Sequence, residues 1–323
     1  MSDAPPPLPR GAKGGYAPAK KAVNREAHAI TDRGTMPELP EAETIARQLS
    51  RELTGRTFGG VRLLRGDVAT GDHVGLDRIL PGRKIERVWR RAKRVVIDLD
   101  GELRLIVRLG MSGRLTVQAV EGPVEKHTHL RATLGGTSLE LRFVDSRRFG
   151  GIACVMRGGE RDRQEWEHLG LEPLETTAGE FRRVLSRRRQ IKALLMDQSA
   201  IAGLGNIYCD ESLHAAHIHP LAVADCLKPD RVSALFRAIK TTLRRAIRFN
   251  GSTLMDYRDA DGKEGSFQRL HKVYQREGRP CRTCATPIRR IIAAGRSTFF
   301  CPNCQPRQRK QGSRTKGTFL RQV

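Results

Sequence analysis

The sequence predicts an α+β protein of several domains: an N-terminal antiparallel β-sandwich with flanking helices, then a helical domain, then a small β-hairpin module. Three observations support this. Apolar residues alternate with a period of two from Thr57 to about Met156, which is typical of strands. Beyond Gly158 their spacing becomes helical, and near the C-terminus two Cys-x2-Cys pairs flank two short β-like runs. A chain of 323 residues, 38% of them hydrophobic, is long enough for more than one core.

The composition of the chain changes at about residue 36. Residues 1–35 are rich in Pro and Gly and lack an apolar period, which predicts a disordered extension or a misassigned translation start. From Met36 onward, Pro40 and acidic residues precede apolar residues at helical spacing, so we expect a helix that Gly55 ends. This helix opens the β-sandwich domain, which we place at residues 36–158.

Tight turns divide this domain into about eight strands around one core. Asp100-Gly101 and Gly135-Gly136 lie between paired apolar runs. Two-residue hairpin loops require such residues because they tolerate positive φ. We therefore expect hairpins at both places.

The rest of the chain is divided by composition and spacing. The clearest helix is 230–249, where apolar residues form one stripe that ends at Asn250-Gly251. We expect a linker at residues 159–179 and a helical domain at 180–266. A hairpin module at 267–306 and a basic tail at 307–323 would follow.

The charge of the chain predicts a polyanionic partner. Fifty-nine Lys and Arg against 35 Asp and Glu give a net charge of +24, and the sequence pI is about 10.7. Residues 263–323 hold 15 Lys or Arg against only Glu264 and Glu277. No run reaches the roughly 18 apolar residues of a membrane span, so we expect no membrane partner.

Four of the seven cysteines predict a metal site. Cys281-x2-Cys284 and Cys301-x2-Cys304 have the spacing of a four-thiolate Zn²⁺ site, and an ion with four protein ligands is structural because no position stays open for substrate. Between the pairs, two short strands joined at Ala293-Ala294-Gly295 would form a β-hairpin that displays Arg296. The other cysteines are expected to be plain thiols.

Several motifs, in order along roughly residues 36–306, resemble those of formamidopyrimidine-DNA glycosylases. The zinc hairpin is one of them. The others are Met36-Pro-Glu-Leu-Pro-Glu, Arg91-Ala-Lys93, Leu109-Gly-Met-Ser-Gly113, Asp145-Ser-Arg-Arg-Phe-Gly150 and Gly203-Leu-Gly-Asn-Ile-Tyr208. The resemblance implies that the helical domain is a helix–two-turn–helix domain.

The resemblance also implies the activity. Such an enzyme excises 8-oxoguanine and formamidopyrimidines from double-stranded DNA through a Schiff base, then cleaves the abasic site by β,δ-elimination. Pro37 would be the nucleophile, Glu38 the acid/base that assists sugar ring opening, Glu41 a supporting residue, and Lys93 a residue at the abasic site. An amine nucleophile must be neutral, and a free α-amino group titrates at roughly 7.7–8.0, so a free Pro37 is close to usable.

The same resemblance assigns DNA-binding residues. Those that fill the void left by the extruded base would be Met111, Arg147 and Phe149. The remaining assignments, mostly to phosphate binding, are His127, Lys192, Asn206 and Arg296. Arg108 departs from the family, which commonly has His there. The segment Asp256–Phe267 is expected to be a mobile loop near the damaged base.

Two alternatives remain open at this stage. An endonuclease VIII-type glycosylase for oxidised pyrimidines shares the fold, the zinc hairpin and the nucleophile. A non-catalytic damaged-DNA binder would result if residues 1–35 are retained, because Pro37 within a peptide bond has no free amine. We expect instead an active chain that begins at Pro37, as a cytoplasmic, nucleoid-associated monomer.

Overall fold

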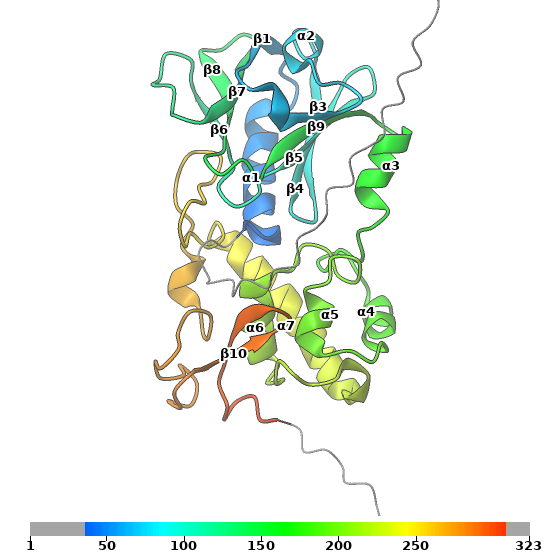
Figure 1. Cartoon of the computed structure of the whole chain (residues 1–323), viewed down its shortest axis with the longest axis vertical. Coiled ribbons are helices and arrows are strands. Elements are labelled where there is room, and N and C mark those ends of the chain that lie inside the picture. The colour runs from blue at the N-terminus through cyan, green and yellow to red at the C-terminus, as the bar shows by residue number, and fades with distance from the viewer. Residues whose placement is uncertain (1–35, 308–323) are drawn as a thin grey trace, which may run out of the picture. The chain divides into compact units, whose positions relative to one another are not determined.

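The computed structural model describes residues 36–307, so the expectations for residues 1–35 and for 308–323 of the basic tail lie outside the described residues. Within this range nine strands, β1 to β9, form two sheets (Figure 1). Their order is β1-β7-β8-β6 in one sheet and β2-β9-β5-β4-β3 in the other. The strands are Phe58–Leu63, Ala69–Gly71, Ile85–Arg91, Arg94–Leu99, Leu103–Arg108, Arg114–Ala119, Thr128–Leu134, Leu139–Val144 and Gly151–Met156.

The pairing confirms the predicted β-sandwich. Every neighbouring pair is antiparallel except β2 with β9, which is parallel. A short helix, α2 (Leu76–Ile79), lies between β2 and β3. The hairpin at Asp100-Gly101 joins β4 to β5, with Gly101 and Glu102 at positive φ, and Gly135-Gly136 joins β7 to β8.

Helix α1 (Leu39–Leu53) contributes to both of the main cores. Ile45, Leu49 and Leu53 are buried among the strands, whereas Leu39 belongs to the core of the helical domain. The helix ends as predicted, with Gly55 just beyond it at a φ of +87°. In Figure 1, α1 lies between the strands and α7, with which it makes contacts. Its N-terminus is thereby placed where the two cores meet.

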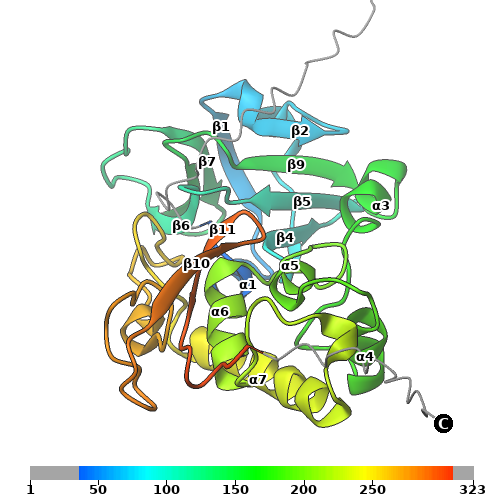
Figure 2. The same cartoon turned by 60° about the horizontal axis from the view of Figure 1, so that its bottom comes forward.

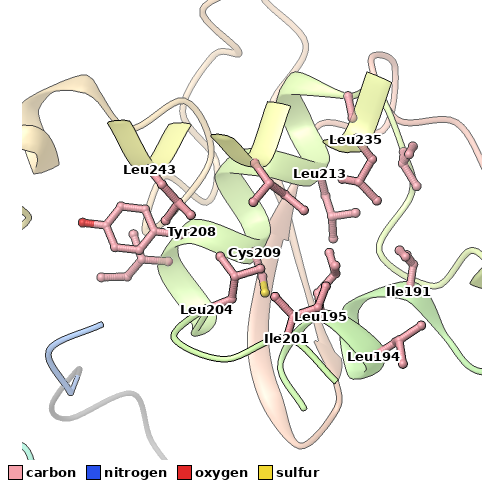
Figure 3. Packing of buried hydrophobic residues seen from close by; sticks show 14 of the residues in the cluster. Ile191, Leu194, Leu195, Ile201, Leu204, Tyr208, Cys209, Leu213, Leu235 and Leu243 are labelled. Atoms are coloured by element: carbon pink, nitrogen blue, oxygen red, sulfur yellow. The ribbon is translucent and has the colours of Figure 1, made fainter. Parts of the chain in front are cut away.

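The helical domain is built from the long helix α7 (Pro229–Arg248) and several short helices. Figure 3 shows part of its core, where Leu213, Leu235 and Leu243 pack with residues of α5 and α6. Asn250 and Gly251, both at positive φ, follow α7 as expected. The remaining helices are α3 (Glu160–Trp166), α4 (Ala178–Leu185), α5 (Ile191–Leu195) and α6 (Asn206–Ala215). The segment expected to be a linker thus contains α3 and the start of α4.

The C-terminal module is a hairpin of β10 (Arg289–Ala293) and β11 (Arg296–Phe300). Ala294 and Gly295 at its tip have φ of +52° and +68°, a pair of positive values that a tight two-residue turn requires. Figure 2 shows this hairpin beside α6, which β11 contacts. No helix among residues 36–307 is long and apolar enough to span a membrane.

Candidate active site and DNA-binding surface

Glu38 connects the start of α1 to the start of α6. Its side chain is buried, and its two carboxylate oxygens accept hydrogen bonds from the backbone N–H groups of Gly205 and Ile207, each at 2.9 Å. These donors lie at the N-terminus of α6, where unpaired N–H groups favour a negative charge. Leu39 N–H also donates to Gly203 O at 3.0 Å. The predicted nucleophile, Pro37, therefore directly precedes two residues that are hydrogen-bonded to the Gly-rich turn.

Glu41 organises the same place from one turn further along α1. Its Oε2 accepts the Glu38 N–H at 2.9 Å. Its Oε1 accepts the Tyr208 hydroxyl at 2.5 Å and the Ser252 N–H at 2.7 Å. Glu41 thus fixes the backbone next to Pro37; its supporting role in the reaction stays a prediction. Tyr208 and Ser252 were not predicted as site residues.

Burial changes the acidity of both carboxyl groups. The pKa of Glu38 is raised to about 7, mainly because burial desolvates the carboxyl group. The charge of Glu41 also raises it, whereas the Lys93 charge and the α6 hydrogen bonds lower it. Desolvation also raises the pKa of Glu41, against the hydrogen bond from Tyr208. A carboxyl group that titrates near neutrality can both donate and accept a proton at physiological pH. Glu38 therefore has the acidity that a general acid needs.

Lys93 lies in the two-residue turn between β3 and β4. Arg91 pairs with Arg94 across this turn, and Ala92 has a φ of +53°. The carboxylate of Glu172 accepts the Ala92 N–H at 2.6 Å and pairs with Arg91 at 2.8 Å. Glu172 therefore fixes the turn that carries Lys93, although it comes from the segment expected to be a linker.

The residues predicted to fill the void lie on two adjoining loops. Buried Asp145 accepts the Ser112 hydroxyl at 2.5 Å, and Ser112 Oγ accepts the Arg147 N–H at 3.0 Å. Ser112 follows Met111, so these bonds join the Met111 loop to the Arg147 loop. The Arg147 guanidinium lies 5.3 Å from the centroid of the Phe149 ring, which is 62% exposed. Phe149 is thus not a core residue.

The other residues predicted to bind DNA have different environments. His127 is exposed beside the same loops, and its carbonyl accepts the Asp145 N–H at 3.1 Å. Arg296 is exposed at the start of β11. Asn206 begins α6, and its Nδ2 donates to Ser297 O at 3.0 Å. Asn206 and Arg296 therefore lie on neighbouring elements.

The four predicted zinc ligands are brought together. The Sγ atoms of Cys281, Cys284, Cys301 and Cys304 all lie within 4.8 Å of one another. Tetrahedral Zn–S bonds of about 2.3 Å put ligand sulfurs roughly 3.8 Å apart, and the Cys281–Cys304 separation is 3.9 Å. Four thiols at these distances fit one structural Zn²⁺.

Comparison with known proteins identifies the family. Three family models match: the formamidopyrimidine-DNA glycosylase N-terminal domain at residues 36–152, the formamidopyrimidine-DNA glycosylase H2TH domain at 169–258, and the zinc finger found in FPG and IleRS at 278–307. A formamidopyrimidine-DNA glycosylase of Herpetosiphon aurantiacus is 45% identical over 275 residues, which are 84% of this chain and all of that protein. The chain belongs to the formamidopyrimidine-DNA glycosylase family.

Solved structures agree with this assignment. MutM (Fpg) from Thermus thermophilus superposes with a TM-score of 0.73 at 39% identity, covering 83% of this chain and 98% of that one. Lactococcus lactis Fpg in complex with Fapy-dG DNA superposes with a TM-score of 0.76 at 31% identity, covering 84% and 100%. By family, the chain is a bifunctional DNA glycosylase and abasic-site lyase.

Lys192 does not lie where the sequence analysis placed it. Its side chain is fully buried, and its Nζ is 2.7 Å from both Asp210 Oδ1 and Thr298 Oγ1. Asp210 Oδ2 accepts the Phe299 N–H at 2.8 Å. In this glycosylase Lys192 therefore joins α5 and α6 to β11, and its ammonium group does not reach the surface to bind a phosphate.

Arg108, where the family commonly has His, forms an ion pair. Its Nη1 lies 3.0 Å from a carboxylate oxygen of Glu165, which is also 3.4 Å from Arg94. The guanidinium is thus held against α3. Its side chain remains 39% exposed, so it is anchored at the edge of the β-sandwich domain.

Proposed function

We propose that this glycosylase excises 8-oxoguanine and formamidopyrimidines from duplex DNA through the secondary amine of Pro37, and then cleaves the strand at the abasic site. One observation supports the proposal most directly. The carboxylate of Glu38, the residue after Pro37, is hydrogen-bonded to the N-terminus of α6, and the charge of Lys93 lies near it. Structures of Lactococcus lactis Fpg hold DNA with Fapy-dG and DNA with an abasic site, which supports the same substrates here.

The proposed reaction assigns one step to each group. The Pro37 nitrogen forms a bond to the sugar C1′ while the bond to the damaged base breaks; that electron pair leaves with the base, which takes up the proton that the amine nitrogen loses. Glu38 donates a proton to the ring oxygen, so the ring opens and a cationic iminium forms. Loss of a 2′ proton then expels the 3′ phosphate, and a second elimination expels the 5′ phosphate. Water hydrolyses the remaining Schiff base and frees the amine.

A strand-cleavage assay tests the proposal against its alternatives. The 37–323 protein should cleave an 8-oxoguanine duplex faster than a matched duplex with an oxidised pyrimidine. The reverse preference would indicate an endonuclease VIII-type enzyme. Tight binding without cleavage of either duplex would indicate a damaged-DNA binder.

The acidity of Glu38 predicts how excision depends on pH. The protonated carboxyl group is the donor, and its pKa is raised to about 7, whereas the Pro37 amine must be neutral and titrates at roughly 7.7–8.0. Single-turnover excision of 8-oxoguanine should therefore pass through a maximum between these two values, and Glu38 should account for the limb that falls at higher pH. Glu38→Gln cannot donate a proton and should slow excision by about 10²–10⁴-fold, without that pH limb. Cleavage of a preformed abasic site, which has no glycosidic bond left to break, is the control. An unchanged limb in Glu38→Gln would assign it to another group.

Phe149 is expected to act as the wedge. Phe149→Ala should slow excision of a paired base by roughly tenfold or more, because unstacking costs a few kcal/mol, and should slow cleavage at a preformed abasic site less. Phe149→Leu keeps an apolar wedge and should retain more activity. Single-turnover rates on the two substrates decide the matter. Equal slowing on both would remove the wedge role.

Arg296 is expected to bind a phosphate. Arg296→Ala should weaken lesion-containing and undamaged duplexes alike, and the plot of log affinity against log salt should become shallower by about one. Arg290 on the same hairpin is the matched control, because Glu277 lies 3.7 Å from it and already offsets its charge. A loss confined to damaged DNA would show that Arg296 reads the lesion.

A further inference from the structure

A cleft between α1 and α7 has no part in the site described above. Its volume is about 820 Å³, and four arginines line it: Arg47 and Arg51 from α1, and Arg244 and Arg248 from α7. Each pair is spaced four residues apart, so its members lie on one face of their helix, about one turn from each other. The two helices contact each other (Figure 1). We call this feature the arginine cleft.

Most of the positive charge in the arginine cleft is not neutralised. Arg47 pairs with Glu43 at 2.6 Å. Within residues 36–307, Arg51, Arg244 and Arg248 form no ion pair or side-chain hydrogen bond, and all three are exposed. The one acid in the lining, Asp261, is shared with Lys263 at 3.7 Å and Gln48 at 3.5 Å. Three unpaired guanidinium groups around one cleft favour a bound anion.

The lining also indicates which anion. Guanidinium groups bind phosphate oxygens through paired N–H donors. The only apolar residues in the lining are Leu174 and Ile247, and no aromatic side chain is present on which a base could stack. A ligand that presents phosphates, with its bases turned away, therefore fits better than a nucleoside or a single base.

The arginine cleft is separate from the lesion site. Arg51 follows Leu39 by twelve residues of α1, which is about 18 Å along the helix axis at 1.5 Å per residue. Pro37 and Glu38 lie at the opposite end of that helix. We propose that the arginine cleft binds the phosphodiester backbone of a second nucleic-acid segment, outside the duplex that holds the lesion.

The test measures binding while the lesion site is filled. The full chain is saturated with a short duplex that carries a stable abasic-site analogue, and a fluorescent, lesion-free oligothymidylate is then titrated and followed by anisotropy. A second binding event is expected. In Arg244→Gln/Arg248→Gln it should weaken about tenfold or more, with a salt slope shallower by about 1.4, since each single-strand phosphate contact contributes about 0.7.

A matched control removes the same charge from the same helix. Arg237 and Arg245 are exposed on α7 but do not line the arginine cleft, so Arg237→Gln/Arg245→Gln should retain the second binding event. If both double variants lose the same affinity for the oligothymidylate, the effect depends only on net charge, and the proposal is overturned. Second-site binding of tripolyphosphate or oligoglutamate in preference to the oligothymidylate would also overturn it. No bond is cleaved in this experiment, so its outcome is independent of the nucleophile.

Discussion

Borohydride reduction should trap a covalent DNA complex with the 37–323 protein through Pro37, and little or none with the uncleaved 1–323 protein. The reason is chemical. Within a peptide bond the Pro37 nitrogen has no lone pair available for attack, whereas as a free α-amine it titrates near neutrality. The match to the family model begins at residue 36, and the Herpetosiphon aurantiacus relative is covered over its whole length by 84% of this chain. We therefore propose that the active chain begins at Pro37.

Mass spectrometry of the trapped adduct is the measurement that decides this prediction. The control is Glu38→Gln in the 37–323 protein, which keeps the amine and should still trap on a preformed abasic site. If the intact 1–323 protein traps and cleaves as efficiently, Pro37 is not the nucleophile. Lys93, whose charge already acts on Glu38, would then be the leading candidate amine.

Local sequence signals were sufficient for the elements of the fold. The α1 stripe and the paired cysteines depend on neighbours close in sequence, and both are present. Hairpins also form at both predicted places, but residues 100–102 and 135–138 separate their strands, and neither Asp100 nor Gly135 has positive φ, so the loops are longer than the two residues predicted. The family motifs then placed Pro37, Glu38 and Glu41 at one site. These residues lie within one helical turn of one another, so their proximity did not depend on tertiary structure.

Contacts between segments far apart in the sequence could not be predicted from such local patterns. The family resemblance assigned Lys192 to phosphate binding, but Asp210 and Thr298 come from other elements and compensate its buried charge. Glu172 meets the Lys93 turn across about 80 residues of sequence. No local pattern marks these partners, since the packing of α5, α6 and β11 brings the first set together and the packing of the segment after α3 on the β-sandwich domain brings the second.

The segment Asp256–Phe267 illustrates the same limit. It was expected to be a mobile loop, and most of it is irregular, but Asp259 is fully buried. Gln48 of α1 donates to Asp259 at 2.9 Å and accepts the Ala260 N–H at 2.9 Å. Val117 N–H of β6 donates to Ala260 O at 3.0 Å. The first half of the segment is thereby anchored to the β-sandwich domain.

Cys284→Ser, or removal of zinc by a chelator, should reduce DNA affinity by at least about 100-fold. Metal binding to such a cluster is worth about 10–16 kcal/mol at neutral pH, which is folding free energy for the hairpin. The hairpin supplies Ser297 O to Asn206, Phe299 N–H to Asp210, and Arg296 to the surface. Without the metal, the residues of α6 and β11 that we propose to bind phosphates therefore lose their common support.

The measurement is duplex affinity by fluorescence anisotropy, with zinc content from elemental analysis. Cys226→Ser is the matched control, because Cys226 is an exposed thiol outside the zinc cluster, and it should leave affinity unchanged. The β-sandwich core contains no residue of the hairpin, whereas Cys281, Ile288, Phe299 and Cys301 belong to the helical core. The β-sandwich should therefore keep its circular dichroism signal while the helical domain loosens. Full DNA affinity in a zinc-free preparation would show that the hairpin is held by its packing on α6 rather than by the metal.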